Sequence, residues 1–139
     1  SDATLNRGGV RLGTAEFYSV IEAMPEIVDS LVVHLEGTDG GIGDLMLFVV
    51  LGPGAELDGA LRGRIAAELR QRLSPRHVPD VIHPVDGIPV TLSGKKLEIP
   101  VKRILSGTAV DVAASRAALA NPEALDAFER LAAFRHRRT

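Results

Sequence analysis

The segment 57–74 carries an apolar side chain at every fourth position, which is the spacing of one face of an α-helix. These side chains belong to Leu57, Leu61, Ile65, Leu69 and Leu73. Arginines occupy the other face, where Glu68 lies at helical spacing to pair with them. An apolar stripe of this kind must be buried against another layer of the fold. The segment therefore predicts an amphipathic helix packed on a sheet.

Two short apolar runs upstream of this helix predict the sheet that it covers. They span 30–36 and 44–52, and Val, Leu and Phe dominate both. The glycine-rich segment 37–43 between them permits the positive φ angles of a turn, so the two runs are predicted to be paired strands. A third, short strand is expected within 80–90, where apolar residues lie between prolines and a glycine and end in an exposed turn.

A helix is also predicted at 14–24, where apolar residues recur at helical spacing. Thr14 is a suitable N-cap, and Glu16 in the first turn favours the helix dipole. Pro25 ends the helix.

Two more helices are predicted in the C-terminal part of the chain. The segment 99–107 favours a brief helix that begins at Pro100, because proline is tolerated in a first turn. The segment 121–134 has Asn121 as a candidate N-cap and Pro122 at the first helical position, followed by apolar residues on one face.

The predicted fold class is therefore α+β. It comprises an N-terminal β-hairpin, a central sheet of about three strands flanked by helices, and a C-terminal helical tail. The alanine-rich segment 109–120 is predicted to be a packed connector. Residues 1–134 are expected to form one domain and 135–139 a disordered basic tail.

Composition excludes several classes of function. The chain has 139 residues and a formal net charge of -2, so it can bury a core but lacks the basic excess of a nonspecific nucleic-acid surface. It contains no cysteine, which excludes disulfides, thiolate nucleophiles and cysteine metal sites. No apolar run approaches the roughly 20 residues of a membrane span. We expect a cytoplasmic protein without a membrane or nucleic-acid partner.

The start of the chain, "SDATLNRGGVRLG", lacks an initiating Met and soon enters a patterned region. It is typical either of a piece of a larger protein or of a processed chain or tag remnant before a complete domain.

Familiar self-contained catalytic motifs are missing. The sequence has no GxxxxGK[ST], HExxH, GxSxG or strand-linked GxGxxG pattern. The histidines have neither a carboxylate nor a second histidine at metal-ligand spacing, and they are His34, His77, His83 and His136. We interpret them as structural or solvated and predict no metal site.

The three lysines of the chain all fall in "PVTLSGKKLEIPVKRIL", as Lys95, Lys96 and Lys102, while the other cationic side chains, histidine aside, are arginines. Ser93 and Gly94 form a flexible turn from which Lys95 projects. A compact ammonium on a long stem can reach a phosphate or carboxylate as a point charge, whereas arginine favours a planar, bidentate partner. The alternative is a surface turn with solvated lysines.

A second candidate is "NRGGVRLG", in which Gly8, Gly9 and Gly13 flank Arg11. Such glycines are typical of a tight hairpin that allows close backbone approach to a ligand, or of an ordinary turn before a helix.

Together, "SDATLNRGGVRLGTAE" and "GIPVTLSGKKLEIPVKRIL" resemble the C-terminal domain of the adenylate-forming enzymes, the superfamily of acyl-CoA synthetases, peptide-synthetase adenylation domains and luciferases. The segment "EIPVKRILSG" and the tail "NPEALDAFERL" resemble the acetoacetyl-CoA synthetase branch in particular. The resemblance covers the chain up to about Phe134.

The resemblance implies a two-step ligase reaction in fatty acid and lipid metabolism. A carboxylate attacks ATP to give an acyl-adenylate and pyrophosphate, and the thiol of coenzyme A then displaces AMP. ATP, with Mg²⁺, and the short acyl substrate would be held by a large N-terminal domain. The small C-terminal domain rotates between orientations that serve the two steps. This chain resembles the small domain alone, which should be inactive by itself.

By the same resemblance, Lys95 would contact carboxylate and phosphate oxygens during adenylation, and Asp2 would be the hinge residue. Gly9 would leave room for the pantetheine arm of coenzyme A, and Arg11 would meet nucleotide phosphate.

The resemblance is looser at two other positions. Arg70 matches a position that contacts coenzyme A phosphates, and Arg72 or Arg76 are the alternatives for that contact. Lys96 doubles the charge where many relatives have an apolar residue, but the Ser-Gly spacing favours Lys95. Reversible lysine acetylation, with a lysine acetyltransferase and deacetylase as partners, is also implied.

Two alternative interpretations of the function stay open from the sequence alone. The chain could be a free-standing binding or regulatory module that uses Arg11 and the lysine turn as an anion site. It could also be the same domain of another acyl-CoA synthetase.

Overall fold

The computed structural model describes residues 4–37 and 41–137, and the chain divides into two compact units. The N-terminal unit is Ser1–Val85 and the C-terminal unit is Asp86–Thr139. Within the described residues, no helix combines the length and the apolar character that a membrane crossing needs.

The N-terminal unit begins with a β-hairpin of strands β1 (Thr4–Arg7) and β2 (Val10–Gly13). Gly8 and Gly9 form its two-residue turn with φ angles of 57° and 81°, which glycine adopts without a steric penalty. Leu5 and Leu12 face each other across the ladder and are buried. The predicted hairpin is confirmed, and its apolar pair anchors it to the core.

Helix α1 (Thr14–Ile21) follows the hairpin directly. The prediction of Thr14 as its N-cap is wrong, because Gly13 holds that position in an extended conformation and Thr14 is the first helical residue, with 2% exposure. The Glu16 carboxylate reaches back and accepts a hydrogen bond of 3.3 Å from the Gly13 backbone N–H. Glu16 therefore satisfies the backbone donor of the N-cap residue Gly13, which has no side chain to accept from the first N–H groups of the helix as a Thr14 cap would have done.

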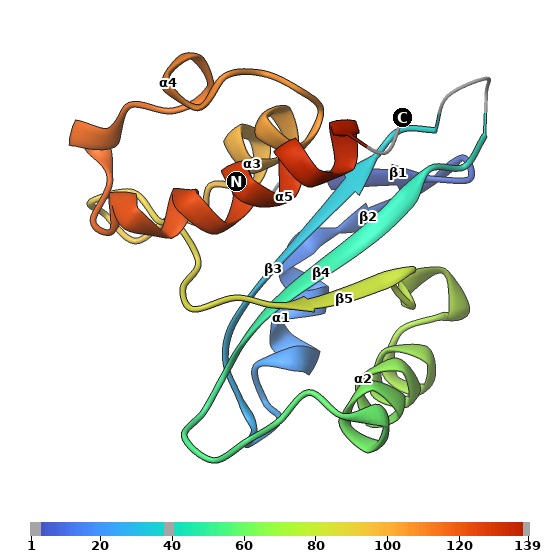
Figure 1. The fold of residues 1–139 in the computed structure, drawn as a ribbon. Helices are drawn as coiled ribbons and strands as arrows, with labels where there is room; N and C mark the ends of the chain where they lie inside the picture. Colours follow the sequence, from blue (N-terminus) through green and yellow to red (C-terminus); the bar gives the residue numbers. More distant parts are fainter. Residues whose placement is uncertain (1–3, 38–40, 138–139) are drawn as a thin grey trace. The chain divides into compact units, whose positions relative to one another are not determined.

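The central sheet has the order β3-β4-β5, as Figure 1 shows, which confirms the predicted three strands. The strands are β3 (Ile27–Leu35), β4 (Asp44–Leu51) and β5 (Val81–Pro84). β3 and β4 pair antiparallel, whereas β4 and β5 pair parallel. A parallel pair needs a crossover connection, and the helix between β4 and β5 supplies it.

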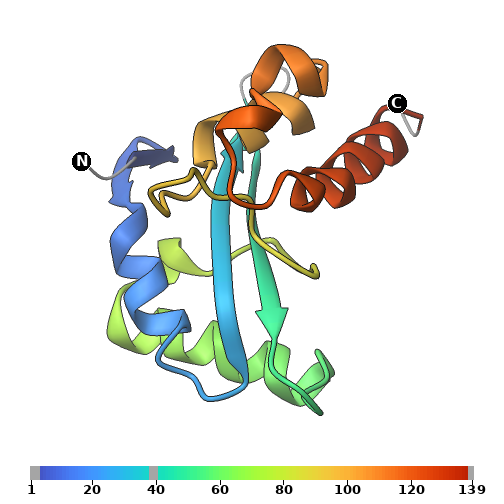
Figure 2. The same ribbon diagram turned by 90° about the vertical axis from the view of Figure 1, so that its left-hand side faces the viewer.

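That helix is α2 (Gly59–Arg72). Its N-cap is Asp58, whose carboxylate accepts a 2.9 Å hydrogen bond from the Leu61 N–H. Its apolar stripe is buried together with side chains of α1 and of one face of the sheet. Figure 2 shows α1 beside the strands and α2 crossing behind them. On the outer surface Arg72 Nε lies 3.1 Å from Glu68 Oε1, as the spacing predicted. The amphipathic helix is confirmed.

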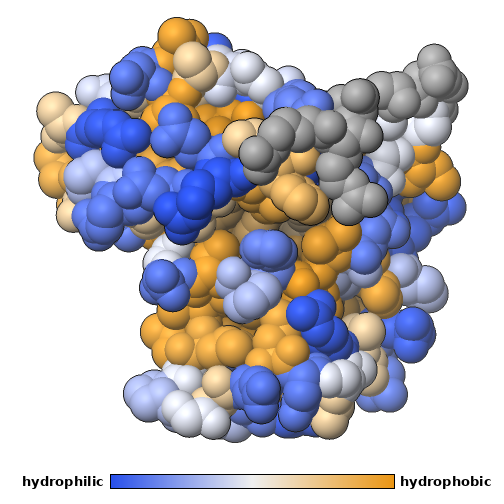
Figure 3. Space-filling model, viewed as in Figure 1, coloured by the Kyte–Doolittle hydropathy of each residue, from blue (hydrophilic) through white to orange (hydrophobic). Residues whose placement is uncertain are grey.

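The C-terminal unit contains α3 (Glu98–Leu105), α4 (Val110–Ala113) and α5 (Leu125–Arg137). α3 packs against α5. The inner face of α5 is apolar, with Leu125 and Phe128 fully buried, and its visible outer surface is largely hydrophilic (Figure 3). Val110, Ala113 and Leu119 are buried, so the predicted connector is packed.

Two predicted boundaries in this unit are wrong. α3 begins at Glu98 and not at Pro100, which stands in its first turn, where a missing N–H breaks no helical bond. α5 begins at Leu125, after a 3₁₀ turn at Pro122–Ala124. It continues through Arg137, into the segment predicted as a basic tail. The division of the chain at residue 134 stays a prediction.

Candidate functional site

The lysine turn, residues 90–96, is a tight hairpin in the C-terminal unit. Thr91 N donates to Lys95 O and Gly94 N donates to Thr91 O, each at 2.8 Å. Gly94 has a φ of 89°, and Val90 and Lys96 pair across the turn in an antiparallel bridge. This is a short loop closed by a glycine with positive φ, and it gives the backbone at Lys95 a fixed direction.

Side chains reinforce the turn from within. The Thr91 hydroxyl oxygen accepts a 3.0 Å hydrogen bond from the Lys95 backbone N–H and lies 3.0 Å from the Ser93 hydroxyl. The Ser93–Gly94 turn was predicted to be flexible, but hydrogen bonds of Thr91 within the loop stabilise it.

A second segment braces the lysine turn from outside. Leu119 forms a bridge with Thr91, and Ala120 N donates to Val90 O at 3.0 Å. The Asn121 side chain accepts from Val90 N at 3.0 Å and donates to Ile88 O at 2.8 Å. Asn121 holds the N-cap position of the 3₁₀ turn Pro122–Ala124, but its side chain does not cap that turn, because its amide bonds the segment that leads into the lysine turn.

Lys95 itself is exposed at the end of this rigid support. Among the described residues no carboxylate lies within ion-pair distance of its ammonium. Lys96 and Lys102 are half-buried. Lys95 is thus the lysine of this segment whose charge is most available to a ligand.

Gly9 and Arg11 come together in the hairpin of the N-terminal unit, where both are exposed. A methyl group placed on Gly9 would have no neighbour within 4 Å, so the space above this residue is open. The structure brings these two predicted residues into one loop, whereas Lys95 belongs to the other unit.

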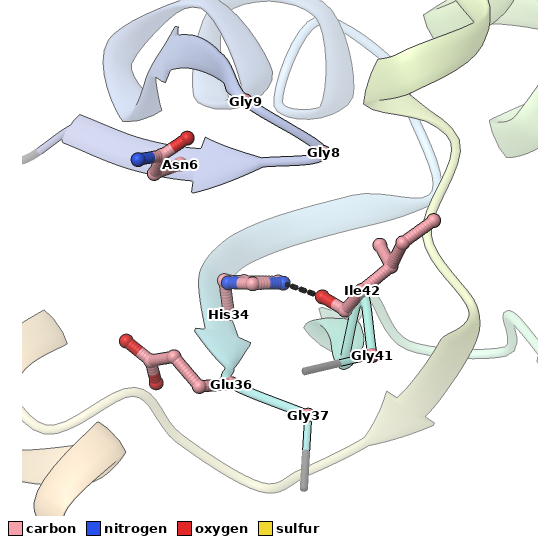
Figure 4. Close-up of a pocket in the computed structure, with 8 residues that line it drawn as sticks. All are labelled: Asn6, Gly8, Gly9, His34, Glu36, Gly37, Gly41 and Ile42. Atoms are coloured by element: carbon pink, nitrogen blue, oxygen red, sulfur yellow. Dashed lines mark hydrogen bonds between the residues drawn. The ribbon is translucent and has the colours of Figure 1, made fainter. Parts of the chain in front are cut away.

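The hairpin turn borders a hollow of about 400 Å³ in the N-terminal unit (Figure 4). Its lining residues are Asn6, Gly8, Gly9, His34, Glu36, Gly37, Gly41 and Ile42. His34 is buried, and its Nε2 lies 2.7 Å from the Ile42 carbonyl oxygen, so it holds the neighbouring loop. His34 therefore has the structural role that the sequence predicted for it.

Arg7 was missed by the sequence analysis, although it directly precedes the hairpin turn. Its Nη1 donates to Arg76 O at 3.0 Å and to Val78 O at 2.6 Å. Its Nη2 donates to both carboxylate oxygens of Asp80, at 3.0 and 3.1 Å. No spacing rule connects residues 73 positions apart, so the pairing depends on the fold alone.

The three arginines considered for phosphate contact have different surroundings. Arg70 is exposed on α2, and Arg72 is paired with Glu68. Arg76 lies beside the hairpin, because a methyl group placed on Gly8 would be 2.8 Å from its Nη1. Of the three, Arg76 is the one shown next to the predicted loop.

His77 is a buried imidazole at the end of a 3₁₀ turn that follows α2. Its Nδ1 lies 2.7 Å from the Ser74 hydroxyl, and its Nε2 lies 3.6 Å from Glu16 Oε2. Burial lowers the pKa of His77, and the nearby Glu16 charge only partly opposes this shift. The pKa of His83 is also lowered, by burial and by the charge of Arg62. Both side chains are structural and favour the neutral form.

These shifts predict a loss of stability in acid. In the unfolded chain both histidines titrate near their ordinary value of 6.5, so the unfolded state binds more protons between that pH and the lowered folded values. The free energy of unfolding should reach its full value at pH values above the ordinary histidine pKa of 6.5 and decrease as the pH falls below it. In His77→Gln the unfolding free energy, measured by urea titration at several pH values, should fall less steeply. The exposed His136→Gln is the control, and an unchanged slope in His77→Gln would contradict the assignment.

Asp2, the predicted hinge residue, lies outside the described residues. In the part of the chain that is described, no three His, Asp or Glu side chains are placed to hold a metal ion.

No family model matches the chain. Relatives are nevertheless clear from sequence. The chain is 52% identical over 128 residues to acetoacetyl-CoA synthetase of Caenorhabditis elegans, a match that covers 92% of this chain and 18% of the relative. It is 46% identical over 128 residues to acetoacetyl-coenzyme A synthetase of Rhizobium meliloti, covering 92% of this chain and 19% of the relative. The chain thus spans less than one fifth of the length of these curated relatives.

Solved structures give the same result. Acetoacetyl-CoA synthetase from Streptomyces lividans matches with a TM-score of 0.87 and 46% identity over 96% of this chain and 19% of that one. An acyl-CoA synthetase of Brucella canis matches with a TM-score of 0.61 and 27% identity over 68% of this chain and 17% of that one.

Proposed function

Because the chain belongs to the acetoacetyl-CoA synthetase family of adenylate-forming enzymes, we propose that it is the mobile C-terminal domain of such an enzyme. The whole protein would join acetoacetate to coenzyme A and convert ATP to AMP and diphosphate. The remainder of that protein would bind the substrates and Mg²⁺, and the fragment alone would not turn over. This domain would serve the two half-reactions in two orientations.

Lys95 is the proposed catalytic residue of the adenylation step. Its ammonium would orient the attacking carboxylate and stabilise the charge that develops on the phosphate oxygens. The hydrogen bonds of Thr91 and Asn121 support this role, because they hold the turn in place before a substrate arrives. A preorganised charge costs no rearrangement at the moment of reaction.

The hairpin residues Gly9 and Arg11 are proposed for the thioester-forming step. Gly9 would leave a passage for the pantetheine arm, and Arg11 would contact nucleotide phosphate. The open space at Gly9 supports this role. For the phosphates of coenzyme A we propose Arg70, and the position of Arg76 beside the hairpin makes it the alternative. Asp2 stays the proposed hinge.

A single observation carries the proposal: an exposed lysine with no ion-pair partner among the described residues stands on a braced turn, in a chain that is 52% identical to part of an acetoacetyl-CoA synthetase. A free-standing anion module would not account for a match confined to 18% of a much longer relative.

The test is an assay of the full-length protein that carries this chain. With ATP, Mg²⁺ and coenzyme A, it should release AMP and pyrophosphate with each acyl-CoA formed, and its kcat/KM should be highest for acetoacetate among short carboxylic acids. A higher kcat/KM for acetate or butyrate would assign the domain to another acyl-CoA synthetase. Absence of AMP and thioester with every acid would exclude the ligase.

Three further predictions belong to this function. They are a cytoplasmic location, a place in fatty acid and lipid metabolism, and regulation by acetylation of Lys95 or Lys96. Acetylation of Lys95 would remove the charge that the adenylation step uses.

A further inference from the structure

The contact made by Arg7 has no part in the function proposed so far. Arg7 is the last residue of β1, and its guanidinium binds the backbone oxygens of Arg76 and Val78 and the carboxylate of Asp80. We call this set the Arg7 clamp. The Arg7 side chain is only 15% exposed, so solvent screens the clamp less than an ordinary surface pair.

The clamp is fixed at its far end to the central sheet. Asp80 Oδ2 accepts a 2.8 Å hydrogen bond from the Leu45 N–H, and the Asp80 N–H donates to Leu45 O at 2.8 Å. Leu45 lies near the start of β4 and is fully buried. The guanidinium therefore connects the tip of the hairpin, through Asp80, to the buried central strand of the sheet.

The hairpin needs such a connection. A two-stranded ribbon is only marginally stable, and β1 and β2 have four residues each. Leu5 and Leu12 bury the middle of the ribbon, but Gly8 and Gly9 at its tip have no side chains to pack. Arg7, next to that tip, holds it by a side chain that reaches the segment before β5.

We propose that Arg7 and Asp80 are positioning residues for the thioester-forming step, an inference that rests on the proposed function of the Gly9–Arg11 loop. Their contact fixes where Gly9 and Arg11 stand, and neither residue needs to touch coenzyme A. A displacement of about 1 Å in a positioning element can cost about 100-fold in rate. Lysine cannot replace Arg7, because one ammonium lacks the planar fork that meets several acceptors at once.

The experiment uses the full-length protein with Arg7→Lys, Asp80→Asn and both together. Single-turnover conversion of bound acyl-adenylate to thioester should slow about 100-fold in Arg7→Lys, while ATP–pyrophosphate exchange stays within about twofold of the parent. The double variant should lose no more than the worse single variant, because both substitutions cut the same contact. Hydrogen exchange of the amides of residues 8–10 should accelerate, whereas amides in α2 should not change.

The matched control is Arg64→Lys, since Arg64 forms an ion pair with Glu26 in the same unit, on residues outside the hairpin and the clamp. It should leave both half-reactions unchanged. The proposal is overturned if folded Arg7→Lys and Asp80→Asn keep the thioester rate, or if exchange falls as much as the thioester step. Loss of folding in both variants would assign the contact to stability alone and also overturn it.

The variant Gly9→Leu, measured in the same assays, distinguishes the proposed role of the Gly9–Arg11 loop from the proposed role of the Arg7 clamp. If Gly9→Leu spares the thioester step, the proposed role of the loop is wrong. If Gly9→Leu blocks that step and Arg7→Lys does not slow it, only the Arg7 clamp is wrong.

Discussion

Lys95→Ala in the full-length protein is expected to slow ATP–pyrophosphate exchange by about three orders of magnitude, the upper range for removing one preorganised charge-stabilising group. The Lys95 ammonium is exposed, and hydrogen bonds within the turn fix the backbone that carries it. The alanine substitution preserves this backbone and removes the charge. Conversion of a supplied acyl-adenylate to the thioester should stay within about threefold of the parent rate, because the lysine is proposed to act only in adenylation. The two half-reactions are measured separately, by isotope exchange and by rapid quench.

Lys96→Ala is the matched control for this substitution. It removes the same charge from the neighbouring, half-buried position and should retain most of the exchange activity. Lys95→Arg should not restore exchange fully, since the guanidinium differs in shape and hydration from an ammonium. Equal loss of both half-reactions in Lys95→Ala would refute the division of labour, and an unaffected exchange rate would exclude Lys95.

Gly9→Leu should have the opposite effect, lowering the thioester-forming step by about 100-fold or more while adenylation continues. The space above Gly9 is open, with no atom within 4 Å of an added methyl group, and a leucine would fill it where the pantetheine arm is proposed to pass. The measurement is the single-turnover rate of thioester formation at saturating acetoacetate and ATP.

Gly54→Leu controls for backbone strain. Gly54 has a φ of +80° and Gly9 a φ of +81°, and both have open space around them, so the conformational cost of a side chain is similar. Gly54 lies in the turn after β4, outside the proposed loop. If both variants slow the thioester step alike, strain and not obstruction is the cause, and unchanged catalysis in Gly9→Leu would count against the loop.

The local spacing of apolar residues and glycines was sufficient to predict most of the helices and strands. The four-residue period from Leu57 to Leu73 predicted α2, and the double glycine at 8–9 predicted the hairpin, because each signal corresponds to one backbone geometry. Apolar runs likewise predicted β3 and β4. The pairing of β3 with β4 was predicted from the glycine-rich segment between them, whereas the parallel pairing of β4 with β5 was not, since an apolar run does not identify its partner.

The predicted helix caps show where local propensity is insufficient. Asn121 has a typical capping residue's side chain, but the backbone groups of Ile88 and Val90 offered both an acceptor and a donor in the folded chain. Thr14 is not the cap of α1, because the helix already includes it and Gly13 takes the capping position. A capping propensity describes the hydrogen bonds that a side chain forms with its sequence neighbours. In the folded chain, backbone groups from distant segments compete for the same side chain.

The candidate site was predictable only in part. The lysine at position 95, directly after Gly94 in a chain whose other basic residues are mostly arginines, drew attention to the turn that the structure shows as exposed. Arg7 and Asp80 gave no such signal, because a charged residue beside a glycine pair is common. Their contact becomes visible only when the hairpin is placed against the segment before β5.

The side chain of Asn121 ties the lysine turn to chain that comes much later. Its bond with Val90 joins residues 31 positions apart, and Ala120 adds a backbone bond to the same residue. A shortened protein that stopped after α3 would leave the donor of Val90 and the acceptor of Ile88 unsatisfied. The position of the lysine turn therefore depends on the later segment: an insertion between α3 and α5 must return the polypeptide to the same place to keep these bonds.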